Sequence, residues 1–129
     1  MKKSLIHIAY ESDIISNSDM RLISEKVYRC IEAEIPFIYV SYPYALDYFR
    51  SLGFKSFSPF INEDYDKEED AKKRLYKIFT EIKRLSEIPF NQLKKQIQDL
   101  EPIFEHNLKT LSENHNKTQD DIFRILNDK

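Results

Sequence analysis

The sequence predicts an α/β domain, a small Rossmann-like three-layer unit with about three parallel strands and a helical C-terminal extension. Three short apolar runs, at residues 5–10, 35–40 and 54–57, have the length of buried strands. Segments with helical spacing of apolar residues separate these runs, the alternation typical of a parallel sheet. After residue 60, apolar residues recur only at helical spacing.

A strand, a helix and a second strand open the chain. The run Leu5–Tyr10 predicts a buried strand, and a polar loop follows it. Ser24 can cap a helix in which Val27 and Ile31 lie on one face. The strand at 35–40 follows this helix at once. Together they form a βαβ unit.

A second helix and strand complete the first half. We expect the helix to begin at Pro43 and to end at Gly53, the only glycine in the protein, which suits a left-handed C-cap. Residues 54–57 then form a third strand. The expected organisation is a single domain, 1–129, made of a βαβαβ half, 1–60, and a helical extension, 61–129.

Three helices are expected in the extension. The second of these helices runs from Asn91 to Leu111, and Pro102 should kink or divide it. A last helix begins with Thr118 as its cap. The first helix has one apolar face, which we expect to be buried: Ala71, Leu75, Ile78, Phe79, Ile82 and Leu85.

Composition excludes several classes of function. The chain has 129 residues, of which 33% are charged and 41% hydrophobic, the balance of a globular domain. Its formal charge of −2 shows no basic excess, so we expect no nucleic-acid partner. The apolar run after Met1 is too short for export or a membrane span, so we expect a cytoplasmic protein. Cys30, the single cysteine, is expected to be a buried hydrophobe.

Ser24, Glu25 and Lys26 are the candidate binding residues. They open the helix of the βαβ unit, where α/β proteins commonly hold phosphates. A phosphate there needs amide donors and a positive charge. The alternative is ordinary first-turn chemistry, an acid that suits the helix dipole and a solvated base. No residue pattern identifies a catalytic group, and we expect neither a metal nor a resident cofactor.

Four segments occur in a recognisable order: Ser-Glu-Lys-Val-Tyr at 24–28, Ile-Pro-Phe-Ile at 35–38, Leu-Gly-Phe-Lys-Ser-Phe at 52–57 and Asn-Glu-Asp-Tyr-Asp at 62–66. In this order the chain resembles the C-terminal part of glycosyltransferase-like proteins of phages, large viruses and bacteria. It is similar, more remotely, to the donor half of the α-1,3-fucosyltransferases, which have the GT-B architecture of two Rossmann domains. The resemblance covers roughly residues 5 to 111.

The resemblance implies binding of a nucleotide sugar. Glu25 would accept hydrogen bonds from the ribose hydroxyls, Lys26 would neutralise a phosphate, and Ser24 would cap the helix. Two departures from the family pattern stand out. Ser41 begins the segment in which relatives have a glycine, and the N-terminal domain that carries the acceptor site and the general base has no counterpart in this chain.

Two functions follow from these observations. The first is a donor-binding domain that is incomplete as an enzyme; if active, it would be a glycosyltransferase with a partner subunit that supplies the other domain. The second is a non-enzymatic phage, viral or bacterial interaction protein that uses the fold as a scaffold, as a homodimer or with another partner. In both cases we expect the surface left by a missing domain to favour self-association or partner binding.

Other residues have simpler interpretations. The acidic run from Glu63 to Asp70 lacks the spacing of a calcium loop, so a solvated helix start is favoured over a cation site. His106, next to Glu105, is expected to serve packing or a kink in the helix. The tyrosine group, which we expect at the edge of the core more than as a platform for a base, comprises Tyr39, Tyr42, Tyr44 and Tyr48.

Overall fold

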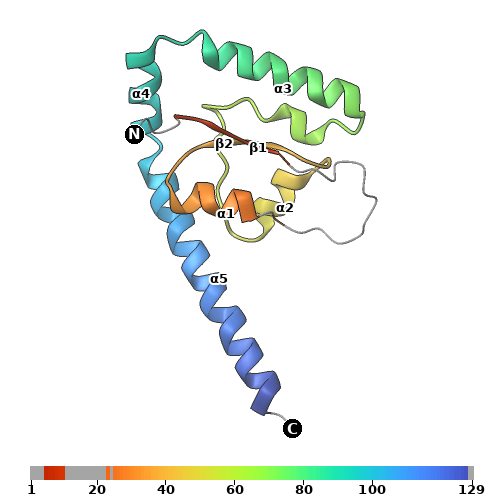
Figure 1. Cartoon of the computed structure of the whole chain (residues 1–129), viewed down its shortest axis with the longest axis vertical. Coiled ribbons are helices and arrows are strands. Elements are labelled where there is room, and N and C mark those ends of the chain that lie inside the picture. The colour runs from red at the N-terminus through yellow and green to blue at the C-terminus, as the bar shows by residue number, and fades with distance from the viewer. Residues whose placement is uncertain (1–4, 11–22, 24, 128–129) are drawn as a thin grey trace.

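The structure is a computed structural model that describes residues 5–10, 23 and 25–127, with side chains described up to Asn114 and at Leu126. It is a mixed α/β fold (Figure 1). Its elements are β1 (His7–Tyr10), α1 (Glu25–Glu32), β2 (Phe37–Val40), α2 (Ala45–Ser51), the 3₁₀ helix η1 (Asp64–Lys67), α3 (Ala71–Ser86), α4 (Phe90–Gln98) and α5 (Glu101–Asn127).

The expected βαβ unit is present. Strands β1 and β2 are parallel, with Ile8 opposite Ile38 and Ala9 opposite Tyr39, and α1 is the crossover between them. All of β2 is buried, whereas in β1 only Ala9 is. Continuous apolar strands are typical of parallel sheets with both faces covered, and β2 meets that expectation. Strand β1 is buried only at Ala9 and does not meet this expectation.

The third strand expected at 54–57 is not formed. The backbone of Lys55 instead pairs with the side-chain amide of Asn107 in α5: the Lys55 N–H donates to Oδ1 at 2.8 Å, and Nδ2 donates to the Lys55 carbonyl at 2.9 Å. The sheet edge that this strand would need is also occupied, because the Tyr39 N–H donates to the Tyr65 hydroxyl at 3.1 Å. Within the described residues the sheet therefore has two strands.

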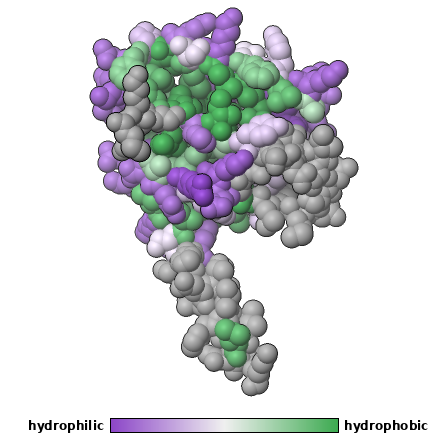
Figure 2. All heavy atoms as spheres, in the orientation of Figure 1, coloured by the Kyte–Doolittle hydropathy of each residue, from purple (hydrophilic) through white to green (hydrophobic). Residues whose placement is uncertain are grey.

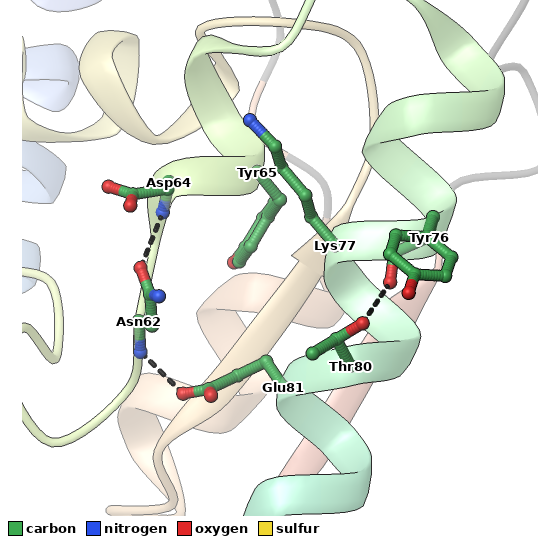
Figure 3. A pocket seen from close by; sticks show the side chains of 7 residues that line it. All are labelled: Asn62, Asp64, Tyr65, Tyr76, Lys77, Thr80 and Glu81. Carbon is green, nitrogen blue, oxygen red and sulfur yellow. Dashed lines mark hydrogen bonds between the residues drawn. The ribbon is translucent and has the colours of Figure 1, made fainter.

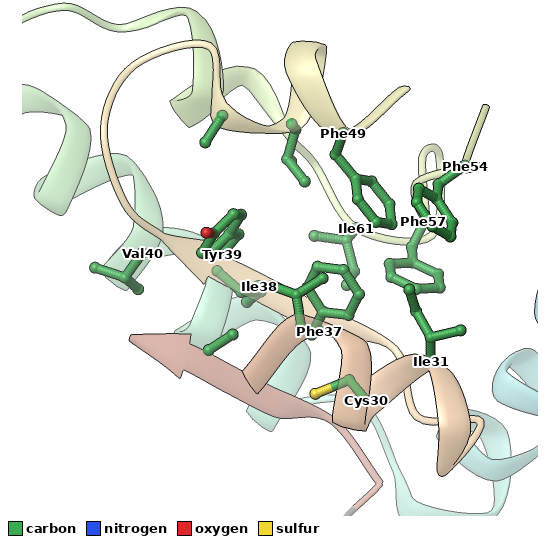
Figure 4. Packing of buried hydrophobic residues seen from close by; sticks show 14 of the residues in the cluster. Cys30, Ile31, Phe37, Ile38, Tyr39, Val40, Phe49, Phe54, Phe57 and Ile61 are labelled. Carbon is green, nitrogen blue, oxygen red and sulfur yellow. The ribbon is translucent and has the colours of Figure 1, made fainter. Parts of the chain in front are cut away.

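Aromatic residues of segment 54–57, which was predicted to be a strand, still belong to the core (Figure 4). Phe37 of β2 meets Phe49 of α2 and Phe57 edge to face, with ring centroids 5.6 and 5.0 Å apart. Phe54 stacks on Phe49 at 4.7 Å. Edge-to-face and offset contacts add to the burial free energy of such rings. The apolar residues at 54–57 thus pack in the core without forming a strand.

Helix α3 begins at Ala71, and Asp70 is its N-cap, since the Asp70 side chain accepts a hydrogen bond from the Lys73 N–H at 2.9 Å. Its buried face is different from the expected one. Ile78 and Leu85 are buried as expected, Ile82 is half-buried, and two further buried residues are charged, Arg74 and Glu81. The expectation was wrong for Ala71, Leu75 and Phe79, which are exposed.

The inward face of α3 differs from the predicted one because the polar loop before the helix needs hydrogen-bond partners. Arg74 donates to the Glu68 carbonyl at 3.0 Å. Glu81 accepts from the Asn62 N–H and from Arg84, whose Nε lies 2.6 Å from Oε1. Buried charges must be paired, so these bonds decide which side of α3 faces inward. Leu75 and Phe79 are left on the surface.

The C-terminal helices agree in part with the prediction from the sequence. Pro102 divides them as expected: α4 ends at Gln98, and the proline lies in the first turn of α5, where its missing N–H is harmless. The break expected at Thr118 is absent, since α5 continues to Asn127 and residues 103–127 contain no glycine or proline. Its last turns extend beyond the body of the molecule (Figure 1). None of the helices described here is long and apolar enough to cross a membrane.

Candidate functional site at the carboxyl edge of the sheet

The candidate site lies where the parallel strands end. Strand β1 ends at Tyr10 and β2 at Val40, and α1 begins beside them with Glu25. In α/β folds this edge, outside the carboxyl ends of the strands, is where ligands bind. The structure thus places the described candidate residues at the edge that general principles favour.

Lys26 reaches the end of β1. Its Nζ donates a hydrogen bond to the Tyr10 carbonyl at 2.7 Å, although the two residues are sixteen positions apart. The side chain is exposed, so its ammonium lies at the surface of this edge. A fixed positive charge is thereby placed within the first turn of a helix, next to the end of a strand.

Glu25 points to its own helix. Its Oε1 lies 3.1 Å from Nη2 of Arg29, and the two side chains are 79% and 72% exposed. Such a surface pair, four residues apart, contributes about 0–1 kcal/mol to stability. A ligand could therefore displace Arg29 at little cost. Ser24 lies outside the described residues.

Ser41 directly follows β2 at the same edge. It is 2% exposed, and its Oγ has no hydrogen-bond partner among the described residues. Buried hydroxyls are normally paired, so an unpaired one at a candidate site is informative.

The N-terminus of α2 is closed by a carboxylate. Asp66 accepts from the Leu46 N–H at 2.8 Å and from the Asp47 N–H at 3.1 Å, and its own carbonyl accepts from the Tyr44 N–H at 2.7 Å. This interaction satisfies the amides that would otherwise attract an anion. The Leu46 and Asp47 amides of α2 are therefore not available to a ligand at this edge.

The acidic run serves the fold. Burial, opposed by the bonds from Leu46 and Asp47, raises the pKa of Asp66. Burial also raises the pKa of Glu63, which accepts from the Phe57 N–H at 3.1 Å and pairs with Arg50 at 3.4 Å. Each carboxylate faces amides or a guanidinium. In the part of the chain that the structure describes, no group of three or more His, Cys, Asp and Glu side chains could hold a metal ion.

The remaining single residues have structural roles. His106 Nε2 lies 2.7 Å from the Gly53 carbonyl, to which only its N–H can donate. Cys30 is buried, and burial raises the pKa of its thiol, as expected of a core residue. Tyr39 is buried, while Tyr42 and Tyr48 are partly buried against the core, which confirms the core-edge interpretation for these three.

A polar pocket between η1 and α3 is not a ligand site (Figure 3). Its volume is about 190 Å³, below the range of about 300–1,000 Å³ usual for small-molecule sites. Its polar groups bond to one another: Asn62 to Glu81 and to the Asp64 N–H, and Thr80 to the Tyr76 carbonyl. Lys77 pairs with Glu68 at 3.4 Å. Little is left for a ligand.

Sequence reasoning missed Asp66 and Asn107 as structural residues. Asp66 caps a helix that begins 21 positions before it, so no local pattern marks it. Asn107 did carry a signal, because it is a polar residue on the stripe of α5 that includes Phe104, Leu108 and Leu111. Buried amides on such a stripe usually have backbone partners.

No family model, curated protein or solved structure matches this chain.

Proposed function

We propose that this domain is the donor-binding half of a glycosyltransferase-like protein, with a Rossmann-like relationship to GT-B enzymes, and that it holds a nucleotide sugar at the carboxyl edge of β1 and β2. One observation carries the proposal: the Lys26 ammonium lies 2.7 Å from the last carbonyl of β1, in the first turn of α1. The order of the four sequence segments, from Ser-Glu-Lys to Asn-Glu-Asp-Tyr-Asp, supports the same assignment.

The proposed contacts follow from charge and geometry. Lys26 neutralises the diphosphate, assisted by the amides at the start of α1. Glu25 exchanges its surface pair with Arg29 for hydrogen bonds from the ribose hydroxyls. In this proposal the acceptor site and the general base belong to another domain or subunit, and no described residue is assigned a catalytic role.

Calorimetry with GDP- and UDP-sugars tests the proposal. We expect the wild-type protein to bind one of these nucleotide classes, and Lys26→Met to weaken binding at least tenfold because the phosphate charge is no longer neutralised. Lys94→Met, on the exposed side of α4, removes the same charge elsewhere and should leave binding unchanged. Absence of binding by the wild type, or equal affinity in Lys26→Met, would overturn the proposal.

A second function, that of a protein interaction module, is favoured by a different observation. Large apolar side chains are exposed on α3 and β1: Phe79 is 65% exposed, Ile8 44% and Leu75 38%. Figure 2 shows a broad hydrophobic area on this face of the molecule. Contiguous apolar surface of this kind marks interaction sites. Light scattering at two protein concentrations tests it, and a strict monomer at both would count against self-association.

A further inference from the structure

We propose that the exposed side of α3 binds the surface of a membrane that contains anionic phospholipids. Tyr76 and Phe79 insert among the lipid headgroups, and Lys72 and Lys83 pair with the phosphates. The inference is independent of both functions proposed above, since it needs neither a nucleotide nor a protein partner. It rests on the charge of α3, on the order of the side chains along its exposed side, and on the exposure of its aromatic residues.

Helix α3 is strongly basic in a chain that is not. It contains six lysines and arginines and a single acid, Glu81, and α4 adds two lysines and no acid. The whole chain has 20 lysines and arginines against 22 acids, so the basic residues are concentrated in these two helices. Charge complementarity therefore favours an anionic partner at this part of the surface.

The positive charge that is available to a partner is carried by lysines. Both arginines of α3 are engaged within the chain, Arg74 by the Glu68 carbonyl and Arg84 by the carboxylate of α3. Lys72 and Lys83 are exposed, and neither forms an ion pair within the part of the chain that the structure describes. A lysine can place its ammonium beside a phosphate while its stem covers apolar surface. These two lysines therefore suit a layer of anionic headgroups.

Two aromatic side chains lie between these lysines. One stripe on the exposed side of α3 has spacings of four, three and four residues: Lys72, Tyr76, Phe79 and Lys83. Tyr76 is 73% exposed and Phe79 65%. In Figure 2, hydrophilic residues border the hydrophobic area at the upper edge of the molecule, where Figure 1 shows α3. Lysines that flank exposed apolar side chains are typical of helices that lie in a membrane interface.

The exposure of these side chains favours a lipid surface over a protein or a nucleic acid. More than half of Tyr76 and of Phe79 is exposed, so both project from the surface and do not line a cleft. A layer of headgroups adapts to projecting side chains, whereas a protein partner needs a surface of matching shape. The apolar surface continues from Phe79 to Leu75 and Ile82, aliphatic side chains that suit acyl chains and cannot stack on a base.

Co-sedimentation with lipid vesicles tests the charge requirement. We expect the wild type to bind vesicles of phosphatidylcholine and phosphatidylserine in equal parts at least about tenfold more tightly than vesicles of phosphatidylcholine alone. Lys72→Glu with Lys83→Glu should weaken binding to the mixed vesicles by at least about tenfold, because both lysines then repel the anionic surface. Lys55→Glu with Lys109→Glu makes the same change in net charge at exposed residues outside α3. This control should bind within about twofold of the wild type at physiological salt.

A tryptophan probe tests insertion separately from charge. The chain has no tryptophan, so Phe79→Trp supplies a single fluorophore, whose emission should shift to the blue when the mixed vesicles are added. Leu126→Trp, at a position that is 64% exposed near the end of α5, should show no shift. Phe79→Ser should keep the circular dichroism spectrum of the wild type, because the position is exposed, and should bind the mixed vesicles at least about fivefold more weakly.

Three results would overturn the proposal. They are a wild type that does not bind the mixed vesicles, an unshifted emission of vesicle-bound Phe79→Trp, and binding of a single-stranded RNA as tight as that of the mixed vesicles. The last result would assign the lysines of α3 to nucleic acid. Nucleotide binding is measured without lipid, so each of these results leaves that proposal unaffected.

Discussion

Side chains complete the backbone hydrogen bonding of this domain at three places where a strand or a helix partner is missing. The Tyr65 hydroxyl accepts the Tyr39 N–H at the sheet edge. Asp66 caps α2 from a distance. Asn107 bonds both backbone groups of Lys55, as a neighbouring strand would. Because buried backbone groups need partners, each of these residues decides the path of a segment far from it in sequence.

Asn107→Ala should be strongly destabilising. The substitution removes the side-chain amide that bonds both the N–H and the carbonyl of Lys55. Asn107 itself is 2% exposed. Both bonds are part-buried, and leaving a buried polar group unpaired costs about 1–3 kcal/mol, so we expect a total loss of about 1–3 kcal/mol in urea denaturation. Asn91→Ala, on the exposed surface of α4, is the matched control and should change stability by less than about 0.5 kcal/mol. A loss below that limit in Asn107→Ala would contradict its role.

Asp66 should give stability a specific pH dependence. Burial raises its pKa above the ordinary 3.8, so the folded protein holds the proton more tightly than the unfolded chain. The stability that this supplies is complete below the ordinary pKa and is lost as pH rises through the raised value. The free energy of unfolding of the wild type relative to Asp66→Asn should therefore fall over that pH range.

Glu68 provides the opposite control. Its desolvation would raise its pKa, but the bonds from the Asp70 N–H and Lys77 outweigh this and lower the pKa of Glu68. Its contribution is then present above the ordinary pKa and lost as pH falls. Relative to Glu68→Gln, wild-type stability should rise with pH. Urea titrations at several pH values measure both differences, and equal slopes for the two variants would contradict the assignment.

At the scale of elements, the features that depend on nearby residues were predicted from the sequence, and the features that depend on distant partners were not. The βαβ unit, the division near Pro102 and the end of α2 at Gly53 depend on nearby residues, and the structure confirms them. The strand at 54–57 and the inward face of α3 depend on partners such as Asn107, which no local pattern could supply. Of the candidate site, the sequence predicted the position of Lys26 but not the closure of α2 by Asp66.

Gly53 illustrates a local signal whose cause can be measured. Its φ is +100°, and an added Cβ would meet only Thr110 Cγ2, at 3.4 Å. The expected loss in Gly53→Ala, about 1–2 kcal/mol, therefore comes from the backbone conformation and not from crowding. Thr110→Ser removes that methyl and keeps the hydroxyl that donates to His106. Chemical denaturation should give the same loss in both backgrounds, and a loss that disappears in Thr110→Ser would assign it to crowding.

At the scale of the whole molecule, the proposed binding edge and the exposed apolar surface that includes Ile8 both involve β1. Lys26 contacts Tyr10 at the end of β1, and Ile8 lies within it. Each copy would carry its own Lys26 and its own α1, so a nucleotide site does not need residues of the second copy. The two proposals therefore predict separate contributions to stability.

Denaturation with and without nucleotide separates these contributions. If the exposed apolar surface that includes Ile8 mediates self-association, the wild-type urea midpoint should rise with protein concentration, whereas the midpoint of Ile8→Lys should be independent of it. A nucleotide sugar at a hundred times its Kd should stabilise both proteins by about 2.7 kcal/mol, because only the folded state binds it. If the nucleotide stabilised the wild type alone, the site would require both copies, and the surface around Ile8 would then belong to the binding site itself.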